Sequence, residues 1–395
     1  MSKILCIIDG MTDSGFRIAD YPNLSRMYLT KHIDTTKGQE PESLGCILRL
    51  LGVEKVPKYL RGYAEALGYG IPVNTNDLIL RGSWFALDEN GRITVPAPAP
   101  ETLQGVDNCR YYHLEQYKSL LVFPGMATFV SDLITHPPYA CGGLPSEQLQ
   151  PEGCIAVEEL FQSQRTKERC LVPWGQSVSR SMPPFSQKAA VICGTPVVKG
   201  IARLLGMEYI PVPGATGDVD TDLVAKTVAA IDAAKRCSFV LLHINGADEA
   251  AHRRCDFEKK SFLHKVDELV IPLLLRSWHD VYVTGDHGTD PESGTHIAEL
   301  QPIFSNVPAS ASIKKADKDE SANIPRQASL KEDQWRIWAV QQLRKKADEV
   351  GRVPTKADFE PIEKIRIKSA LGPWPRALEA AGLKEPKEKK TANRR

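Results

Sequence analysis

The chain has 395 residues, of which 42% are hydrophobic and 25% are charged, and its formal net charge is +1. This length favours more than one domain, and the composition is that of a globular protein rather than a disordered or fibrous one. No stretch approaches the roughly 18 apolar residues of a membrane-spanning helix. The N-terminal apolar run is too short for a secretory signal, so we expect no membrane partner.

The charge is unevenly distributed along the chain. Residues 331–395 contain 17 Lys and Arg against 10 Asp and Glu, a net charge of +7, so residues 1–330 carry −6 of the total. Nine cysteines are scattered through the sequence without a C-x-x-C pair, and several lie in apolar runs. An odd number of dispersed cysteines predicts reduced, buried thiols in a cytoplasmic protein.

The N-terminal part predicts a strand followed by a helix. Lys3 to Asp9 is a continuous apolar run that ends in an acid, as expected of a parallel strand buried on both faces. The apolar positions of 44–52 have helical spacing, which puts Ser43 near a helix N-terminus. One interpretation is that Ser43 has a purely structural role there, as the residue that caps the helix. The same position equally suits a hydroxyl beside backbone N–H groups that favour anions.

The pattern changes between 54 and 185. Strand-like segments at 77–87 and 119–123 alternate with Pro- and Gly-rich connections. We therefore predict a separate inserted α+β domain.

An alternation of strands and helices returns from Ala189. The apolar runs predict strands at 189–193, 237–243 and 281–284. The spacing predicts helices over 196–205, 222–236 and 256–275, the second capped by a Thr or Asp. This order indicates β-α-β units and a mostly parallel sheet with helices on both faces, an α/β fold.

The C-terminal part is predicted to be a separate helical unit. Residues 307–330 are rich in Ser, Ala and charged residues, which is typical of a linker. Residues 331–383 predict a small helical domain, with Trp335 and Trp338 on one helical face and Trp374 on another. Residues 384–395 are a charged tail.

Acids and imidazoles follow three of the predicted strands. They are Asp9, Asp248, His252, Asp286, His287 and His296. Ligands bind beyond the carboxyl ends of strands in such sheets, and Asp248 and His252 share one face if their segment is helical. Each residue alone is more often structural, but three carboxylates and three imidazoles at one edge predict a site for two divalent metals. Such a pair activates a nucleophile and stabilises a transferring phosphoryl group.

The order of these residues resembles the alkaline phosphatase superfamily and, within it, cofactor-independent phosphoglycerate mutase of the archaeal type. The resemblance covers about 3–306. The matching motifs include Gly38-x-x-x-x-Ser43, Leu60-Arg61-Gly, Val198-Lys199-Gly, Pro213-Gly-Ala-Thr-Gly, Ala247-Asp248-Glu-Ala-x-His252, Gly285-Asp-His-Gly and Thr295-His296. It implies a metal-binding core of 1–53 and 186–306, with 54–185 covering the substrate.

The resemblance also implies roles for individual residues. Ser43 would be the nucleophile that becomes a phosphoserine in the interconversion of 3-phosphoglycerate and 2-phosphoglycerate without bisphosphoglycerate. Two groups of metal ligands are implied: Asp9, Ser43, Asp286 and His287 for one ion, and Asp248, His252 and His296 for the other. Asp and His ligands suit Mn or Zn, with Mg as a further candidate. The implied substrate-binding residues are Arg61, Arg81, Lys199 and His136, the last in an altered order of its motif.

Two departures from the family concern the insert. Ser83 replaces an Asn after Arg81, and Lys118-Ser119 replaces an Arg-His pair. The nucleophile is preceded by Glu42 instead of a glycine. These changes leave open a phosphohydrolase or another phosphotransferase acting on a different phosphate or phosphonate ester. A non-catalytic binding protein with the same fold is a third alternative, against which the six ligands and Ser43 argue.

The C-terminal unit resembles the small helical repeat found beside homing endonucleases. The matching segments are Glu349-Val-Gly-Arg-Val-Pro-Thr-Lys356 and Leu371-Gly-Pro-Trp-Pro-Arg376. The net charge of +7 suits weak contact with a nucleic-acid backbone. A docking or oligomerisation module is the alternative, and the oligomeric state is open.

Overall fold

The computed structural model of the chain describes residues 2–103, 108–137 and 143–308, and residues 339–359 and 364–384 with the exception of scattered positions. The chain forms two compact units, Met1–Ser310 and Ala311–Arg395. Most of the predicted linker, Trp335, Trp338 and the tail from residue 385 lie outside the described residues. No described helix is long and apolar enough to span a membrane.

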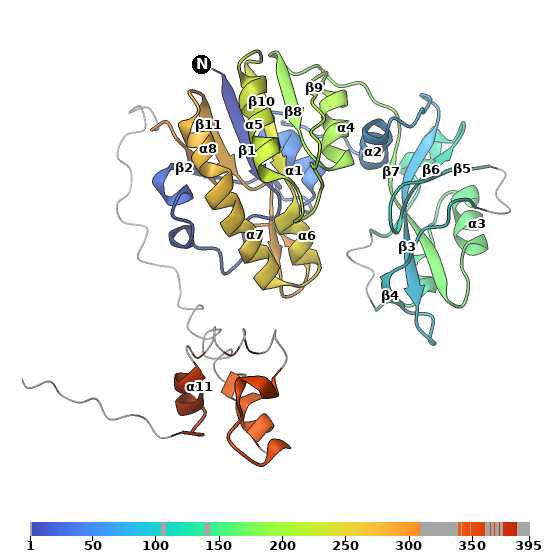
Figure 1. Cartoon of the computed structure of the whole chain (residues 1–395). Helices are drawn as coiled ribbons and strands as arrows, with labels where there is room; N and C mark the ends of the chain where they lie inside the picture. The colour runs from blue at the N-terminus through green and yellow to red at the C-terminus, as the bar shows by residue number, and fades with distance from the viewer. Residues whose placement is uncertain are drawn as a thin grey trace, which may run out of the picture. The chain divides into compact units, whose positions relative to one another are not determined.

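The first unit contains two larger sheets, and the first of them, with seven strands, carries the N-terminal strand (Figure 1). In order across the sheet the strands are β2 (Tyr28–Ile33), β14 (Gln301–Ser305), β11 (Asp280–Thr284), β1 (Lys3–Ile8), β10 (Phe239–Ile244), β8 (Ala189–Ile192) and β9 (Glu208–Tyr209). The pairs from β11 to β9 are parallel, whereas β14 is antiparallel to both of its neighbours. The predicted α/β class with a mostly parallel sheet is confirmed.

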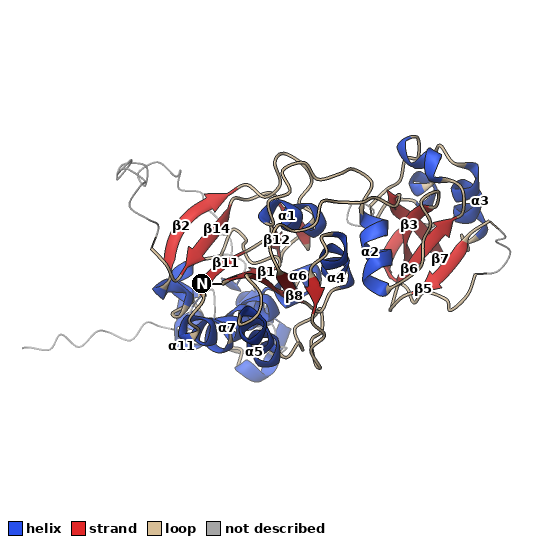
Figure 2. Cartoon of the chain, turned by 90° about the horizontal axis from the view of Figure 1, so that it is seen from above, coloured by secondary structure: helices blue, strands red, loops and turns tan. Residues whose placement is uncertain are grey.

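Helices cover both faces of this sheet (Figure 2). One face carries α1 (Ser43–Leu50) and α4 (Pro196–Leu204), and the other carries α5 (Leu223–Ala234), α7 (Asp256–Leu269) and α8 (Ile271–Arg276). Because successive side chains of a strand point to opposite faces, β1 sends Leu5 and Ile7 into one apolar cluster and Cys6 into the other. Burial on both faces explains why this strand is a continuous apolar run.

The helix predicted over 256–275 is two helices in the structure, and that prediction is wrong. α7 ends at Leu269, and α8 begins at Ile271 with a proline in its first turn. Pro272 has no N–H to donate to the preceding turn, and its ring would clash with the carbonyl group four residues back. The apolar periodicity continues across this break, which is why the spacing alone did not reveal it.

A five-stranded antiparallel sheet lies within the predicted insert. Its strands are β3 (Leu78–Leu87), β4 (Ile93–Pro96), β5 (Arg110–His113), β6 (Lys118–Phe123) and β7 (Arg169–Ser177). The long strand β3 pairs with β4, β6 and β7. Helix α3 (Ile155–Ser163) packs against this sheet through Val157 and Leu160.

Helix α2 (Arg61–Tyr69) joins the two sheets. Ala64 of this helix and its N-cap residue Leu60 belong to the apolar cluster that also contains Val198 and Ile201 of α4. The two helices approach very closely, because a Cβ at Gly200 would lie 1.9 Å from the Ala64 carbonyl oxygen. This contact fixes Arg61, at the start of α2, against the core.

Three short elements complete the neighbourhood of the strand ends. They are α6 (Gly246–His252) and the two-stranded ribbon of β12 (Gly288–Asp290) and β13 (Thr295–Ile297). The described 3₁₀ segments are Ile18–Asp20, Leu24–Arg26, Ala127–Ser131, Ser146–Leu149 and Lys356–Asp358.

The second unit has an apolar core of its own. Helical residues between 339 and 350 and helix α11 (Trp374–Ala380) contribute Leu343, Ala377 and Leu378 to one buried cluster. The Phe359 and Trp374 rings meet edge to face, with centroids 5.4 Å apart. The predicted helical character of this region is confirmed for its described residues.

Candidate active site

The predicted ligands gather where three neighbouring strands end. Asp9 follows β1, and Asp286 and His287 follow β11. Asp248 and His252 lie on α6, directly after β10, and His296 lies on β13. We call these six residues the strand-end cluster. Gly10, with a φ of +64°, makes the cluster compact, because a Cβ there would lie 2.8 Å from the Asp248 Cα.

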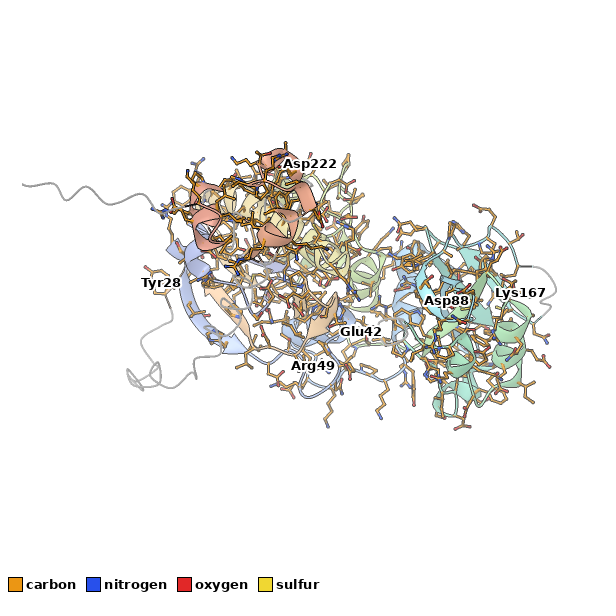
Figure 3. The ribbon with its side chains drawn as sticks, turned by 90° about the horizontal axis from the view of Figure 1, so that it is seen from below. Tyr28, Glu42, Arg49, Asp88, Lys167 and Asp222 are labelled. Atoms are coloured by element: carbon orange, nitrogen blue, oxygen red, sulfur yellow. The ribbon has the colours of Figure 1, made fainter. Side chains whose placement is uncertain are left out.

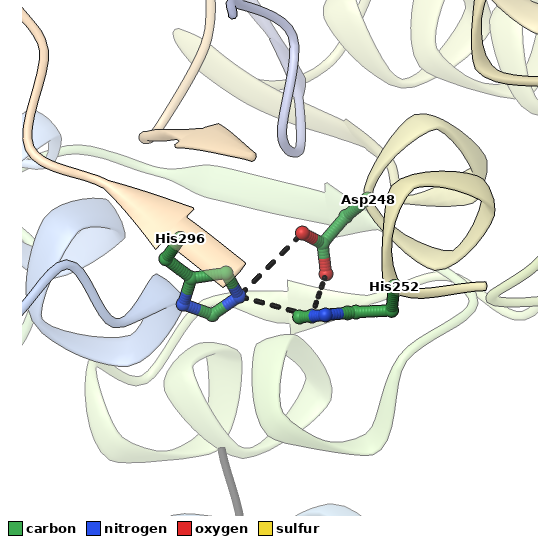
Figure 4. A group of neighbouring side chains, drawn as sticks. All are labelled: Asp248, His252 and His296. Carbon is green, nitrogen blue, oxygen red and sulfur yellow. Dashed lines mark hydrogen bonds and ion pairs between the residues drawn. The ribbon is translucent and has the colours of Figure 1, made fainter. Parts of the chain in front are cut away.

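Asp248, His252 and His296 form one half of the cluster (Figure 4). The His252 Nε2 atom lies 3.2 Å from Asp248 Oδ2, as the four-residue spacing on α6 predicts. The Nε2 atoms of the two histidines face each other at 3.0 Å. His252 Nδ1 is 2.8 Å from the Gly294 carbonyl oxygen, and His296 Nδ1 is 2.6 Å from that of Pro41.

This arrangement fits a cation. An imidazole whose Nδ1–H donates to a carbonyl oxygen has its lone pair on Nε2, and metal-binding histidines are commonly oriented in this way. Two such lone pairs facing each other beside a carboxylate repel unless a positive charge lies between them. In the protein without a metal, burial disfavours charge on His252, and Asp248 overrides this and raises its pKa to about 9.

The second half of the cluster surrounds Ser43. The hydroxyl oxygen of Ser43 is 3.1 Å from His287 Nε2. The same Nε2 atom lies 3.4 Å from a carboxylate oxygen of Asp9 and 3.4 Å from one of Asp286. All three ligands are buried, and Ser43 is the first residue of α1. The predicted nucleophile and these three predicted ligands are therefore adjacent.

The two halves of the strand-end cluster are in direct contact. Asp9, Asp248 and His287 can each offer one ligand atom within 4.8 Å of the others, and the His287 and His296 ring centroids are 4.1 Å apart. The Thr289 hydroxyl donates to Asp248 at 2.6 Å and fixes this carboxylate. Lys259 Nζ in turn donates to the Thr289 carbonyl oxygen at 2.7 Å.

The electrostatics also fit divalent cations. Burial, together with Asp286 and Asp248, raises the pKa of Asp9 well above its usual range. Buried oxygens of Asp9 and Asp286 have no hydrogen-bond partner among the described residues. Buried carboxylates are costly unless they are paired or bind a metal. The donor set of carboxylates and imidazoles therefore fits the two divalent ions that the sequence predicts.

His243 joins the site although it was not among the predicted ligands. His243, the fifth residue of β10, is fully buried and its Nε2 atom lies 3.2 Å from Asp9 Oδ2. Burial lowers its pKa to about 3, so the ring is neutral. With Asp9 and Asp286 it forms a further group that could hold an ion. The sequence signal that could have revealed His243 is an imidazole within an otherwise apolar strand.

Two of the predicted substrate residues lie together in an ion network beside Ser43. Arg61 Nε donates to the Glu65 carboxylate at 2.8 Å, and Arg81 donates to the same Glu65 oxygen. Arg61 also donates through a second nitrogen to Glu42 at 2.7 Å. We call Arg61, Arg81, Glu65 and Glu42 the arginine network.

The charges of this network balance. Burial works against charge on Glu65, and Arg81 and Arg61 outweigh it, so the pKa of Glu65 is lowered. Both guanidinium groups lie near the Trp174 ring, at 5.4 Å for Arg61 and 5.7 Å for Arg81. The network borders a cavity of about 270 Å³, lined among others by Glu42, Arg61 and Gln176.

The other two predicted substrate residues are placed less directly. Lys199 lies in the first turn of α4, with its ammonium 4.9 Å from the Tyr209 ring. His136 is half-buried and follows Thr135, whose hydroxyl donates to Gln176 at 2.6 Å. Through Gln176 the loop carrying His136 reaches the cavity beside the arginine network.

Two residues that depart from the family motifs have structural contacts. Ser83 accepts a hydrogen bond from the Trp174 indole at 3.0 Å, and the buried Ser119 donates to the Gly82 carbonyl oxygen at 3.2 Å. Both hydroxyls are therefore used within the inserted sheet.

Comparisons with known proteins identify two regions of the chain. Residues 91–329 match the family model of the Metalloenzyme superfamily, and residues 338–384 match that of the homing endonuclease associated repeat. A 2,3-bisphosphoglycerate-independent phosphoglycerate mutase of Methanocaldococcus jannaschii is 30% identical over 316 residues, covering 67% of this chain and 76% of that protein. The protein of the same name in Methanococcus aeolicus is 29% identical over 361 residues, covering 77% and 88%.

A solved structure supports the fold. A protein of Pyrococcus horikoshii superposes with a TM-score of 0.58 at 22% identity, covering 77% of this chain and 87% of that one.

Proposed function

Because the chain belongs to the Metalloenzyme superfamily and, within it, to the family of 2,3-bisphosphoglycerate-independent phosphoglycerate mutases, we propose that it interconverts 3-phosphoglycerate and 2-phosphoglycerate. The reaction proceeds by phosphoryl transfer through Ser43 and needs no bisphosphoglycerate. The observation that carries the proposal is the position of the Ser43 hydroxyl, 3.1 Å from His287 Nε2 inside the strand-end cluster.

The strand-end cluster would hold two divalent ions, one by Asp9, Ser43, Asp286 and His287 and the other by Asp248, His252 and His296. Such ions lower the pKa of a bound hydroxyl and offset the charge of phosphoryl oxygens. Carboxylate and imidazole ligands suit Mn or Zn, and Mg is a third candidate.

Phosphoryl transfer and substrate binding are carried out by different residues of the chain. Ser43 attacks the phosphate in line and becomes a phosphoserine, and the released glycerate turns and takes the phosphoryl group back on its other hydroxyl. Arg61 and Arg81 attract the substrate's anionic groups, because a guanidinium binds carboxylate or phosphate in a bidentate manner. Lys199 and His136 complete the substrate-binding set.

Retention of the glycerate decides between a mutase and a hydrolase. If water reached the phosphoserine before the glycerate turned, the product would be free phosphate. The insert, 54–185, is the part that excludes water, and it carries the departures at 83 and 119. A phosphohydrolase acting on a related phosphate ester is therefore the second candidate, supported by the use of Ser83 and Ser119 within the sheet.

The test is an assay of the purified protein with Mn and 3-phosphoglycerate, without bisphosphoglycerate. The proposal predicts 2-phosphoglycerate with little free phosphate, and neither product with Ser43→Ala. Free phosphate without the isomer would favour the hydrolase. No product from protein with bound metal would reject phosphoglycerate as the substrate.

The proposal extends to the second unit and to the location. The net charge of +7 in residues 331–395 and the match to the homing endonuclease associated repeat support weak contact with nucleic acid. Fluorescence anisotropy with duplex DNA, repeated at increasing salt, tests this contact, which should weaken steeply with salt. The eight cysteines among the described residues are free, which supports a cytoplasmic location.

A further inference from the structure

Glu42, the residue immediately before Ser43, forms an ion pair with Arg61, the arginine that is expected to bind substrate. Its carboxylate accepts a hydrogen bond of 2.7 Å from Arg61, and both residues line the same cavity. Glu42 directly precedes α1, whose last turn contains Arg49, and Figure 3 labels both residues. The guanidinium of Arg61 is thus engaged by two acids, Glu42 and Glu65.

The second acid removes the net positive charge of the arginine network. Arg61 and Arg81 with Glu65 alone would carry a net charge of +1, which favours an anion. Glu42 brings the arginine network to zero. Glu65 and Glu42 engage two of the three guanidinium nitrogens of Arg61. A phosphate or carboxylate that binds Arg61 through two nitrogens therefore competes with at least one of these partners.

Glu42 is the partner that can be replaced. The Glu65 side chain is 3% exposed and is shared by two arginines, so breaking its contacts would leave a buried charge unpaired. The Glu42 side chain is 33% exposed and can turn to water at little cost.

Glu42 has no other role in the local structure that would explain its side chain. It occupies the N-cap position of α1 in an extended conformation, and its side chain makes no capping hydrogen bond. Glutamate is not among the residues favoured at an N-cap, where Ser, Thr, Asp and Asn satisfy the free N–H groups. Among the residues that the structure describes, Arg61 is the only hydrogen-bond or ion-pair partner of the Glu42 side chain.

We propose that Glu42 is an internal competitor for Arg61, which the carboxylate or phosphate of the substrate displaces on binding, so that Glu42 sets the affinity and selectivity of the site for anions. The role of Arg61 in substrate binding rests on the proposed function, whereas its pairing with Glu42 does not. The paired state keeps weakly binding monoanions out of the site, and a substrate with two anionic groups gains enough to displace Glu42.

The test compares Glu42→Gln with Glu40→Gln. Glu40 lines the same cavity, and it makes no ion pair within the part of the chain that the structure describes. Both substitutions remove one negative charge at neighbouring positions, but only the first removes a partner of Arg61. The first readout is the rate at which the arginine reagent phenylglyoxal modifies Arg61, followed by peptide mass spectrometry.

We expect Glu42→Gln to accelerate the modification of Arg61 about fivefold, the factor that corresponds to a partly exposed ion pair. Glu40→Gln should leave this rate unchanged. An unchanged rate in Glu42→Gln, or an equal increase in both variants, would overturn the proposal. This readout needs no turnover, so it decides the pairing even if the protein proves not to be a mutase.

The second readout is the KM for 3-phosphoglycerate. Glu42→Gln should lower KM several-fold and change kcat by less than about twofold, because the lost contact exists only in the free enzyme. It should also strengthen inhibition by inorganic phosphate. A higher KM, or a large loss of kcat with KM unchanged, would show instead that Glu42 acts on bound substrate.

Discussion

The strand-end cluster and the arginine network are two partly buried groups of charges that differ in how their charges are balanced. In the strand-end cluster three carboxylates lie together without a lysine or arginine among the six residues, and burial and mutual repulsion raise the pKa of Asp9. In the arginine network two cations and two acids are already paired. The first group needs ions from outside to be stable, whereas the second needs a ligand that can compete with its own contacts. Binding of metal and binding of substrate should therefore respond differently to mutation.

The largest effect should follow from removing a ligand of the strand-end cluster. Asp286→Asn takes one of the buried carboxylates from beside His287 and Ser43. We expect activity to fall by at least about a thousandfold, with loss of bound metal measured by elemental analysis. Asp280→Asn, at the opposite end of β11, is the matched control and should retain both. Full metal content with full activity in Asp286→Asn would contradict the ligand assignment.

Chelation should lower stability as well as activity. Without ions the repulsion among Asp9, Asp248 and Asp286 remains, and an ion present at 100 times its Kd stabilises the fold by about 2.7 kcal/mol. We expect EDTA to lower the Tm by several degrees and Mn to restore it. The arginine network predicts no such dependence, so a Tm unaffected by EDTA and Mn would count against the metal site.

Removing Glu65, the buried acid of the arginine network, should lower the free energy of unfolding. Glu65→Gln leaves two arginines without their shared carboxylate, and we expect it to reduce the free energy of unfolding by about 3 kcal/mol in urea titrations. Glu147→Gln breaks the half-exposed pair with Arg165 and should cost at most about 1 kcal/mol. Equal costs for the two variants would mean that burial does not distinguish Glu65.

Lys226 provides the reverse case, a buried cation without an acid. Its ammonium is fully buried and has no hydrogen-bond partner among the described residues. Burial lowers its pKa from 10.5 to about 8. The unfolded state therefore binds more protons between pH 8 and 10.5, so this lysine makes the protein more stable as the pH rises through that window.

Lys226→Met should remove this cost and stabilise the protein by about 3 kcal/mol at pH 7, with the slope of stability between pH 8 and 10.5 reduced. Urea titrations at pH 7 and pH 10 measure both quantities. Lys235→Met, on an exposed lysine just beyond the same helix, is the control and should change neither. A destabilised Lys226→Met with an unchanged slope would show that the ammonium is well solvated.

The sequence predicted the strand-end cluster better than the arginine network, for a geometric reason. Parallel strands end at one edge, so Asp9, Asp248 and Asp286 could be placed together once the strands were recognised. Arg81 meets Trp174 only through the antiparallel register of β3 and β7, which includes an irregularity beside Arg81. The sharing of Glu65 by two arginines depends on that register and on α2, and no local pattern encodes it.

The roles of His243 and Pro272 were not predicted, because the local sequence around each is compatible with two structures. His243 looked like the end of an apolar strand, but the register of β10 with β1 puts it opposite Ile7, two residues before Asp9. Pro272 was compatible with a continuous helix by periodicity, yet it ends one helix and begins another. In both cases the outcome depends on neighbouring elements that are distant in the sequence.

The central claim is that Ser43 accepts the phosphoryl group within the strand-end cluster. The most direct measurement is mass spectrometry of the peptide that contains Ser43, after rapid acid quench of the Mn-loaded protein turning over 3-phosphoglycerate. The account predicts that this peptide gains the mass of one phosphoryl group at Ser43, and that Asp286→Asn shows no such gain. Formation of 2-phosphoglycerate by a Ser43→Ala variant, with no phosphopeptide in the wild type, would contradict it.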